Sequence, residues 1–407
     1  MEIAFEPMSR GFAQDPYPVY AALRARDEPF FFEGFGGWLL SRHADVEAAA
    51  LNPAMVRSLE AFLPPDEVAA ERRLMGWQDM PSHERFVQFS LLDSDGETHR
   101  RLRMLVMREF TGSFVERHRA MIQSHVDALL TPLLEARDFD FIADFAAHVP
   151  GHVIGGVLGV PEEDRPRLRG WSEDVVQFFD VGRTPAHKAL AERATEEFHQ
   201  YLNGLIAERT RRPREDIISN LIAARAAGRM DGTELISTCM LILMAGHGST
   251  IDVLGTGMNA LIDHPDQMAR LRAAPDMMGS AAQEMFRFES PLPFFHRYAS
   301  AEVEIMGRRW PKGTKFGLLY GSANRDAAAF PAADAFDVGR VPNRHIAFGR
   351  GAHLCLGNHL ARLEMDVVFP SLLRRARSIE RRVDTPTFVR GLSVRGLETL
   401  PVSLDPC

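Results

Sequence analysis

The sequence predicts a mainly α-helical protein with a smaller β-rich part, formed as a single domain by residues 1–407. Over most of the chain, apolar residues recur at spacings of three and four, as in helices that bury one face. Alternation of apolar and polar residues, which indicates strands, is confined to a few short stretches. Length alone would favour two or three domains, but no internal repeat or low-complexity linker marks a boundary between them.

Only short elements are predicted for the first 92 residues. Pro16–Arg24 and Asp45–Leu51 have the spacing of short helices, and Pro29–Ser41 has the composition of a β-hairpin. Between Asn52 and Leu92, four prolines are expected to break any long helix. A loop region of that length inside a globular enzyme usually covers a site.

Longer helices are predicted for the middle of the chain. Their ranges are Asp93–Phe110, Phe114–Leu134, Phe141–Leu158 with an interruption at Pro150-Gly151, Pro161–Phe179, Ala186–Arg212 and Thr233–Asp263. The last is the longest, yet it contains Gly246 and Gly248, and each glycine costs a helix about 1 kcal/mol relative to alanine. We expect a ligand to press against a widened turn there. The alternative is close backbone packing against another helix.

The C-terminal third is predicted to contain most of the strands. Val303–Leu319 alternates with a turn at Lys312-Gly313, and Val394–Leu404 has the pattern of a last hairpin. Pro370 should kink or end the helix that begins near Cys355. Earlier in the chain, Phe178 and Phe179 flank a helix connector and face either a ligand or the core, with the core as the default.

The net charge and the cysteine content limit the classes of protein to which this chain can belong. A net charge of −8 argues against nucleic acid and anionic membranes as partners. The N-terminus lacks the basic start and apolar core of a signal peptide, and we find no apolar run of about 18 residues. Three cysteines without paired spacing fit a reducing compartment. These features predict a soluble, cytoplasmic protein without structural zinc or disulfides.

The segment Phe348–Gly357, FGRGAHLCLG, carries the strongest chemical signal. Gly349 and Gly351 allow the backbone to fold tightly against a flat ligand. Cys355 lies where the loop becomes a helix, so free amide groups and the helix dipole should favour its thiolate, the form that binds metals. The alternative is a small buried hydrophobic residue. The flanking glycines, the neighbouring His353 and the helix start favour a metal-binding thiolate.

Two polar pairs share helix faces elsewhere. His99 and Arg103 are four residues apart, so they could clamp an anion; a solvated basic surface helix is the alternative. Glu284 and Arg287 are three apart, with Arg340 as a plausible third member.

These motifs together resemble the bacterial cytochromes P-450, from about Pro16 to Val402. The resemblance implies an α-rich fold with haem b (iron protoporphyrin IX) between the long helix and the Cys355 loop. By position, Cys355 is the expected axial ligand and Phe348 the ring beside its sulfur. The other expected haem contacts are His99, Arg103, Arg297 and His353 at the propionates, with Ala245, Gly349 and Gly357. Glu284, Arg287 and Arg340 match a structural charge cluster.

The implied activity is insertion of one oxygen atom from O2 into a hydrophobic substrate. Where most relatives have an acid followed by a threonine, this chain has Gly248 and Ser249. We expect the Ser249 hydroxyl to assist catalysis, with protons arriving through water admitted by Gly248 and helped by Thr250. The missing acid motivates two alternatives, a peroxide-using haem-thiolate enzyme and a non-catalytic haem sensor or carrier.

Substrate and partners follow from the same resemblance. The positions expected to face the substrate are Leu241, Met244, Ala245 and Gly248 on the long helix, Leu292, Phe294 and Phe295, and then Leu392 and Ser393. Because these are mostly apolar and two are phenylalanines, a compact terpenoid or aromatic compound is favoured. Electrons should come from a separate ferredoxin and ferredoxin reductase. Arginines expected to form a basic docking face on a monomer are Arg72, Arg73, Arg100, Arg101, Arg108, Arg350 and Arg362.

Overall fold

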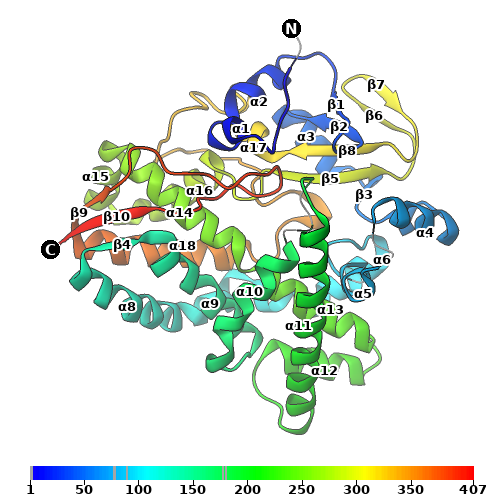
Figure 1. Ribbon diagram of the computed structural model, residues 1–407, viewed down its shortest axis with the longest axis horizontal. Coiled ribbons are helices and arrows are strands. Elements are labelled where there is room, and N and C mark those ends of the chain that lie inside the picture. The colour runs from blue at the N-terminus through cyan, green and yellow to red at the C-terminus, as the bar shows by residue number, and fades with distance from the viewer. Residues whose placement is uncertain (1–2, 77–78, 89, 177, 179–180) are drawn as a thin grey trace.

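The computed structural model describes residues 3–76, 79–88, 90–176, 178 and 181–407, apart from the side chains of residues 87 and 88. Helices form most of the molecule, and a five-stranded sheet lies at one edge with the N-terminal segment (Figure 1). The first five helices are α1 (Arg10–Gln14), α2 (Tyr17–Arg24), α3 (His43–Leu51), α4 (Pro65–Leu74) and α5 (Pro81–Gln88). The expected helices at Pro16–Arg24 and Asp45–Leu51 are therefore confirmed.

The region Asn52–Leu92 is more ordered than predicted. Pro65 and Pro81 do not break helices but begin α4 and α5. Proline is tolerated in the first turn because the amide hydrogen it lacks would have no partner there. Pro150 likewise lies in the first turn of α9, and the predicted interruption falls just before it, in a short 3-10 turn over Ala146–His148.

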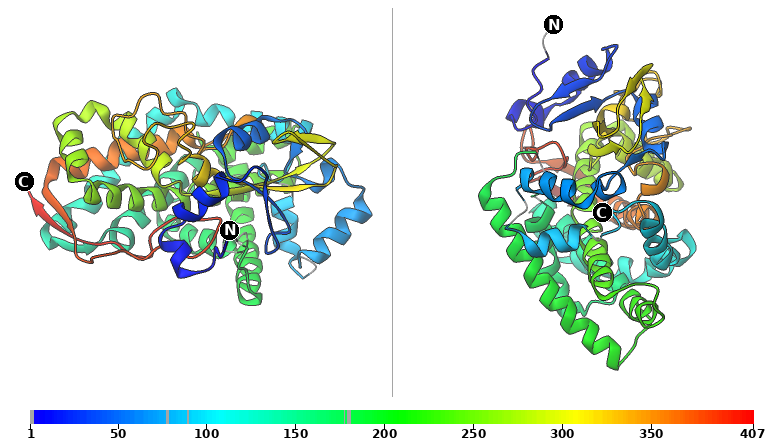
Figure 2. Two further views of the ribbon diagram at one scale, coloured as in Figure 1. Left: turned by 90° about the horizontal axis from the view of Figure 1, so that it is seen from above. Right: turned by 90° about the vertical axis from the view of Figure 1, so that its right-hand side faces the viewer.

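The middle of the chain is mainly helical, with one short strand between α8 and α9. Its helices are α6 (Gly96–Val106), α7 (Gly112–Val115), α8 (Arg119–Ala136), α9 (Val149–Leu158), α10 (Arg165–Val176), α11 (Pro185–Arg211), α12 (Ile217–Ala226), α13 (Gly232–Ala245) and α14 (Gly248–Asp263). The longest, α11, runs along one edge of the molecule in the right-hand view of Figure 2. Phe178, beyond α10, is buried against Met80 and Ala191, as the core assignment predicted, while Phe179 lies outside the described residues.

The remaining helices are α15 (Pro265–Ala273), α16 (Met278–Phe288), α17 (Tyr320–Ala323) and α18 (Asn358–Arg375). Pro370 does not end α18, which continues for five more residues. Its neighbours Val368, Phe369 and Leu372 are all buried, and burial of such side chains outweighs one missing helical hydrogen bond.

Three sheets complete the described fold. The strands are β1 (Phe30–Phe32), β2 (Gly37–Leu40), β3 (Met55–Val56), β4 (Asp138–Asp140), β5 (Phe294–Ala299), β6 (Val303–Ile305), β7 (Arg308–Trp310), β8 (Lys315–Leu319), β9 (Ala376–Arg381) and β10 (Pro401–Pro406). Their orders are β1-β2-β8-β5-β3, β4-β10-β9 and β6-β7. The hairpin at the N-terminus is confirmed. Val394–Leu404 does not form the expected hairpin, because β10 pairs with β9 and β4.

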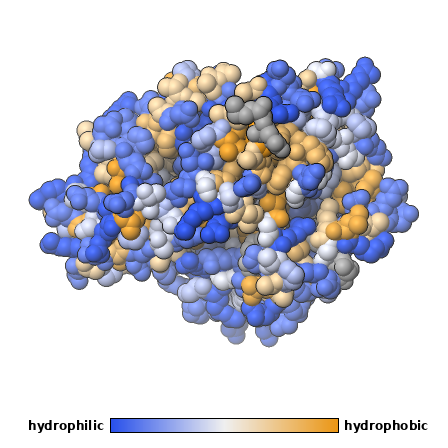
Figure 3. Space-filling model, turned by 45° about the horizontal axis from the view of Figure 1, so that its top comes forward, coloured by the Kyte–Doolittle hydropathy of each residue, from blue (hydrophilic) through white to orange (hydrophobic). Residues whose placement is uncertain are grey.

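Two segments are long and apolar enough to cross a membrane by length and composition, although the sequence analysis had found none. They are Phe141–Leu158 and Gly232–Asp263, each with a mean hydropathy of 1.3. Their most apolar stretches are 72% and 61% buried within the protein, as is typical of core helices. The face in Figure 3 is mainly hydrophilic around a more apolar area.

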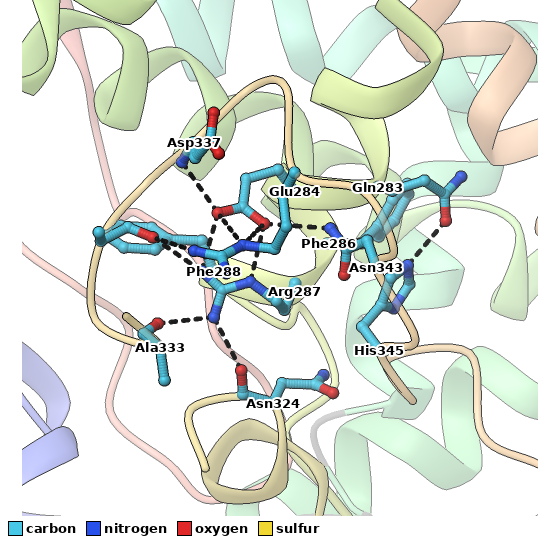
Figure 4. Close-up of polar contacts among 12 residues, drawn as sticks. Gln283, Glu284, Phe286, Arg287, Phe288, Asn324, Ala333, Asp337, Asn343 and His345 are labelled. Carbon is cyan, nitrogen blue, oxygen red and sulfur yellow. Dashed lines mark hydrogen bonds and ion pairs between the residues drawn. The ribbon is translucent and has the colours of Figure 1, made fainter. Parts of the chain in front are cut away.

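The predicted charge cluster is present at the end of α16. The Glu284 carboxylate accepts a hydrogen bond from Arg287 Nε at 2.7 Å (Figure 4). It also accepts one from Arg340 Nε at 3.1 Å. Arg287 also donates to the carbonyls of Asn324 and Ala333 at 2.9 and 2.7 Å. Glu284 and Arg287 are fully buried, so this cluster fixes the loop at 333–343 against α16.

Candidate active site

The segment 348–357 folds as a tight loop that presents Cys355. Cys355 N donates to Phe348 O at 2.8 Å and closes the loop, and Asn358 Nδ2 donates to Cys355 O at 2.7 Å. Gly349 and Gly351 both have a φ near +70°, in the left-handed region that favours glycine. A Cβ at Gly351 would lie 2.6 Å from Ala50 O, so the loop also packs closely on α3.

Cys355 lies three residues before the first residue of α18, whereas the sequence predicted it at the helix start. The helix begins at Asn358 with Gly357 as its N-cap, at φ −82°, so this glycine meets no conformational demand. Burial raises the pKa of the Cys355 thiol, while the Gly357 N–H and the charges of Arg103 and Arg362 act in the opposite direction. The surroundings therefore do not favour a thiolate on their own, contrary to the sequence prediction; coordination to a metal would deprotonate the thiol.

Phe348 lies at the other end of the loop. Its ring packs on Phe286 with the centroids 4.4 Å apart, and the Arg362 guanidinium lies 4.9 Å from its centroid. These contacts hold the loop against α16 and α18.

The four predicted anion-binding residues converge on the same loop. The rings of His99 and His353 lie 4.4 Å apart, and Arg103 Nη2 donates to Leu354 O at 2.6 Å. Arg297, on β5, is only 3% exposed and donates through Nη1 to His296 O at 2.8 Å. The solvated surface helix proposed as the alternative for His99 is excluded, since His99 is buried.

Among the described residues, the two arginines of this cluster lack a carboxylate partner, whereas His353 pairs with Asp95. Within the described parts of the chain, no carboxylate forms an ion pair with Arg103 or Arg297. Burial, followed by the charges of His353 and Arg103, lowers the pKa of His99 to about 4, so this imidazole is neutral at pH 7. Two arginines and two imidazole donors therefore suit a ligand that brings carboxylates.

Sequence reasoning missed two residues that organise the cluster. Asp95 accepts from His353 Nε2 at 3.0 Å and from the backbone N–H groups of Arg57 and Ser58, each at 2.8 Å. Arg57 in turn pairs with Asp93 at 2.7 Å. Asp95 precedes a glycine and a helix, so it looks like an ordinary N-cap, but its side chain caps nothing and holds His353 instead.

The predicted long helix is two helices. It breaks at Gly246 and His247 into α13 and α14, where an ideal Cβ on Gly246 would lie 2.6 Å from Ile154 on α9. Close packing thus explains Gly246. The hydroxyls of Ser172 and Ser249 donate to the freed carbonyls of Met244 and Ala245, at 3.2 and 3.4 Å.

Beside the break, the interior is open. Ala245 is exposed although it ends a central helix, and an ideal Cβ on Gly248 meets no atom within 4 Å. Ser249 keeps partial exposure, whereas Thr250 is buried. A hollow lined by small residues, together with the unpaired cations and Cys355, fits a flat, anionic, metal-bearing ligand.

The predicted substrate residues divide into two groups. Leu241 and Met244 line a pocket of ≈ 20 Å³ with Phe86, Val175 and Phe198, which come from α5, α10 and α11. Phe295 shares a face of β5 with Arg297 and lies under the Arg57 guanidinium, 5.4 Å from its centroid. Leu292 is partly exposed.

Phe294 and Leu392 do not belong to that pocket. Strand alternation turns Phe294 to the opposite face of β5, where it packs on Phe35 at 5.1 Å and in one cluster with Leu392, Phe12 and Tyr20. Both residues support the N-terminal segment.

Comparison with known proteins agrees with this arrangement. The cytochrome P450 family model matches residues 78–395. The chain belongs to the cytochrome P450 family. It is 34% identical over 410 residues to the biotin biosynthesis cytochrome P450 of Bacillus subtilis, covering 100% of both chains. It is 34% identical over 404 residues to the vitamin D(3) 25-hydroxylase of Pseudonocardia autotrophica, covering 97% of this chain and 95% of that protein.

Solved P450 structures share the fold. The crystal structure of P450BioI in complex with a hexadec-9Z-enoic acid-ligated acyl carrier protein has a TM-score of 0.90 and 31% identity, covering 97% of this chain and 99% of that one. This cytochrome P450 is therefore an oxidoreductase that carries protoporphyrin IX haem with thiolate ligation.

Proposed function

We propose that this cytochrome P450 is a monooxygenase whose single domain, residues 1–407, holds haem between the α13/α14 break and the Cys355 loop. Cys355 is the axial ligand, and Ala245, Phe348, Gly349 and Gly357 surround the macrocycle. The observation that carries this proposal is the uncompensated charge of Arg103 and Arg297 beside Cys355, which two propionates would neutralise. His99 and His353 add donors.

A reduced carbon monoxide spectrum tests the ligand. Wild-type protein should show the spectrum of thiolate ligation, and Cys355→Ala should lose it while Cys239→Ala, at a buried cysteine, should keep it. Persistence of the thiolate signal in Cys355→Ala would refute the assignment.

Oxygen chemistry is supplied by the haem, and this chain positions the substrate and the protons around it. The Ser249 hydroxyl borders the hollow and is the expected proton donor on that side, with Thr250 assisting. Ser249→Ala should lower the fraction of NADH electrons recovered in product. Unchanged turnover and coupling in Ser249→Ala would remove this role, whereas Thr131→Ala, at an exposed hydroxyl on α8, is the matched control.

The substrate we propose is a small hydrophobic molecule placed against Leu241, Met244, Leu292 and Phe295. The apolar side chains of Leu241 and Met244, which line one small pocket with Phe86, Val175 and Phe198, support this class. A compact terpenoid or aromatic compound remains our first choice. Phe294 packs on Phe35 instead and is not among the proposed contacts.

An acyl chain is the second candidate, since similar P450s bear names referring to biotin biosynthesis and to a complex with an acylated carrier protein. A spectral binding screen decides between them, with terpenoids, aromatic compounds, hexadec-9Z-enoic acid and its carrier-protein thioester as separate arms, followed by product analysis. Binding of the acyl compounds alone would overturn the compact substrate.

Electrons are proposed to come from a separate ferredoxin and its reductase, acting on a soluble cytoplasmic monomer. The predicted basic face is smaller than expected, because Arg72, Arg101 and Arg350 pair with Glu60, Glu234 and Glu47. Arg100 and Arg108 remain exposed near Met104 and Met107. Reduction by an acidic ferredoxin should therefore slow as salt rises; a salt-independent rate would contradict this docking face.

A peroxide-using enzyme is the second candidate function, favoured by the absence of an acid at Gly248. Product formation with hydrogen peroxide alone, faster than with ferredoxin and reductase, would select it.

A further inference from the structure

The acid missing at Gly248 has a neighbour one helical turn away. Asp252 is four residues beyond Gly248 and three beyond Ser249 on α14, so its side chain lies on the same side of the helix, about 40° around from Gly248. Helical side chains lean toward the N-terminus, which directs this carboxyl back toward both residues. An ideal Cβ on Gly248 meets no atom within 4 Å, so there is room for water beside this turn of the helix.

The carboxyl of Asp252 is enclosed but not satisfied. Across the described chain, no donor forms a hydrogen bond or ion pair with it; Thr256 Oγ1 donates to the backbone carbonyl of this residue instead, at 2.9 Å. The residue is only partly buried, so water can reach part of its surface.

The segment after α18 is built around this carboxyl. A Cβ at Gly396 would lie 1.9 Å from Asp252 Oδ1, so only glycine leaves room for the acid. Burial, reinforced by the charge of Glu173, raises the pKa of Asp252 to about 8, which keeps it protonated at neutral pH.

Glu173 connects this region to solvent. It lies on α10, which packs on α14, and its exposed carboxylate pairs with Arg169 at 2.7 Å. The other charged groups on neighbouring elements are engaged elsewhere: Arg395 pairs with Glu289, and Arg381 on β9 pairs with Asp263. His247, on the same helix, is buried against Gly151.

We propose that Asp252 replaces the absent acid as the residue that passes protons from the Glu173 surface, through water beside Gly248, to Ser249. This inference rests on the proposed monooxygenase function. Each turnover consumes O2, two electrons from the redox proteins and two protons, and it yields one inserted oxygen atom and one water. Asp252 releases its carboxyl proton to the water, Ser249 passes a proton on to the reacting oxygen, and solvent reprotonates Asp252. Asp252 acts through water and Ser249, so it is a positioning residue.

The test compares Asp252→Asn with wild-type holoenzyme. The amide keeps the shape of the carboxyl and a hydrogen-bond donor but cannot titrate. With hexadec-9Z-enoic acid as probe substrate and saturating redox partners, we expect NADH oxidation to slow by about 10- to 100-fold and its solvent deuterium isotope effect to rise. Haem content and thermal midpoint should stay at wild-type values. The control Asp263→Asn changes an acid at the far end of the same helix, where it pairs with Arg381, and should keep the wild-type rate.

Two further measurements separate a relay from a structural role. Infrared difference spectra of the resting enzyme should show a protonated carboxyl that titrates near pH 8 and is absent in Asp252→Asn. Adding Gly248→Glu to Asp252→Asn should restore the rate, because it returns an acid to the open space. A wild-type rate in Asp252→Asn, no titrating carboxyl, or no rescue would each overturn the relay. Wild-type enzyme that oxidises no compound in the spectral screen would instead overturn the proposed function, and the relay with it.

Discussion

At the scale of single residues, two buried arginines differ in how completely they are satisfied. Arg287 has a carboxylate and several carbonyls as partners, so it needs nothing from outside the chain. Arg297 is almost as buried and has one carbonyl at 2.8 Å. Since an unpaired buried charge is costly, Arg297 marks a ligand position, whereas Arg287 stabilises the fold.

Glu284→Gln should show the structural role of the first cluster. Removing the charge leaves Arg287 buried without a counter-ion, which costs about 3–5 kcal/mol in the free energy of unfolding. Urea denaturation measures this loss. Glu302→Gln is the control, because Glu302 forms only an exposed pair with Arg309 at 3.5 Å and should change stability by about 0.5 kcal/mol or less. Equal effects of the two variants would contradict the cluster's role.

Arg297→Gln should affect the cofactor more than the fold. Loss of a charge-assisted hydrogen bond, about 1.5–3 kcal/mol, should accelerate haem release by about 10- to 100-fold. Transfer of haem to an acceptor protein measures the rate. The apoprotein should unfold at the same or higher urea concentration than wild type, because the variant removes an unpaired charge. Normal haem retention would exclude Arg297 from the propionate site.

At the scale of elements, two glycines stand near the break between α13 and α14 for different physical reasons. Gly246 is required by contact with Ile154 on α9, whereas Gly248 faces open space. Close packing against another helix is confirmed for Gly246. The ligand expected at this turn remains a prediction, which the open space at Gly248 permits.

Gly246→Ala and Gly248→Ala are a matched pair that tests this difference. The new methyl at 246 would lie 2.6 Å from Ile154 Cγ1, so the helices must shift, at a cost of about 1–3 kcal/mol. The methyl at 248 meets nothing, and this variant should retain wild-type stability or gain slightly. Thermal unfolding of both variants measures the contrast; equal midpoints would be inconsistent with the packing of α9.

At the scale of the whole molecule, a charge network ties distant segments together. Glu289, after α16, accepts from Tyr17 Oη on α2 at 2.6 Å and from Arg395 Nε in the C-terminal segment at 2.8 Å. Arg325, which follows α17, stacks on Tyr17 with its guanidinium 4.0 Å from the ring centroid. One carboxylate therefore joins three regions that are far apart in sequence.

This network predicts a pH dependence. Burial acts to raise the pKa of Glu289, but Arg395, Arg325 and the Tyr17 hydroxyl outweigh it, so the net shift is downward. A lowered folded-state pKa contributes stability above the unfolded value of about 4.3, and this is lost as pH falls through the folded value. Glu289→Gln should be less stable than wild type at pH 7, with a smaller difference below about pH 4. A pH-independent difference in urea denaturation would contradict this.

The sequence by itself determined the family and the chemistry of the centre. Cys355 between glycines, His99 with Arg103 and the Glu284–Arg287 pair are local patterns, because loop conformation and helix spacing are set by neighbouring residues. Most helices were also predicted, since apolar periodicity records which face is buried. Prolines were less informative about where helices end, because proline begins α4 and α5 but lies inside α18.

Only the tertiary structure decided what surrounds that centre. It placed Asp95 on His353, turned Phe294 away from the pocket and set Gly396 against Asp252. These contacts join segments separated by a hundred residues or more, and no local pattern encodes them, because they depend on how the helices pack. The same packing left Arg297 unpaired and Asp252 enclosed without a partner, and those two unsatisfied groups show where a ligand and a proton path belong.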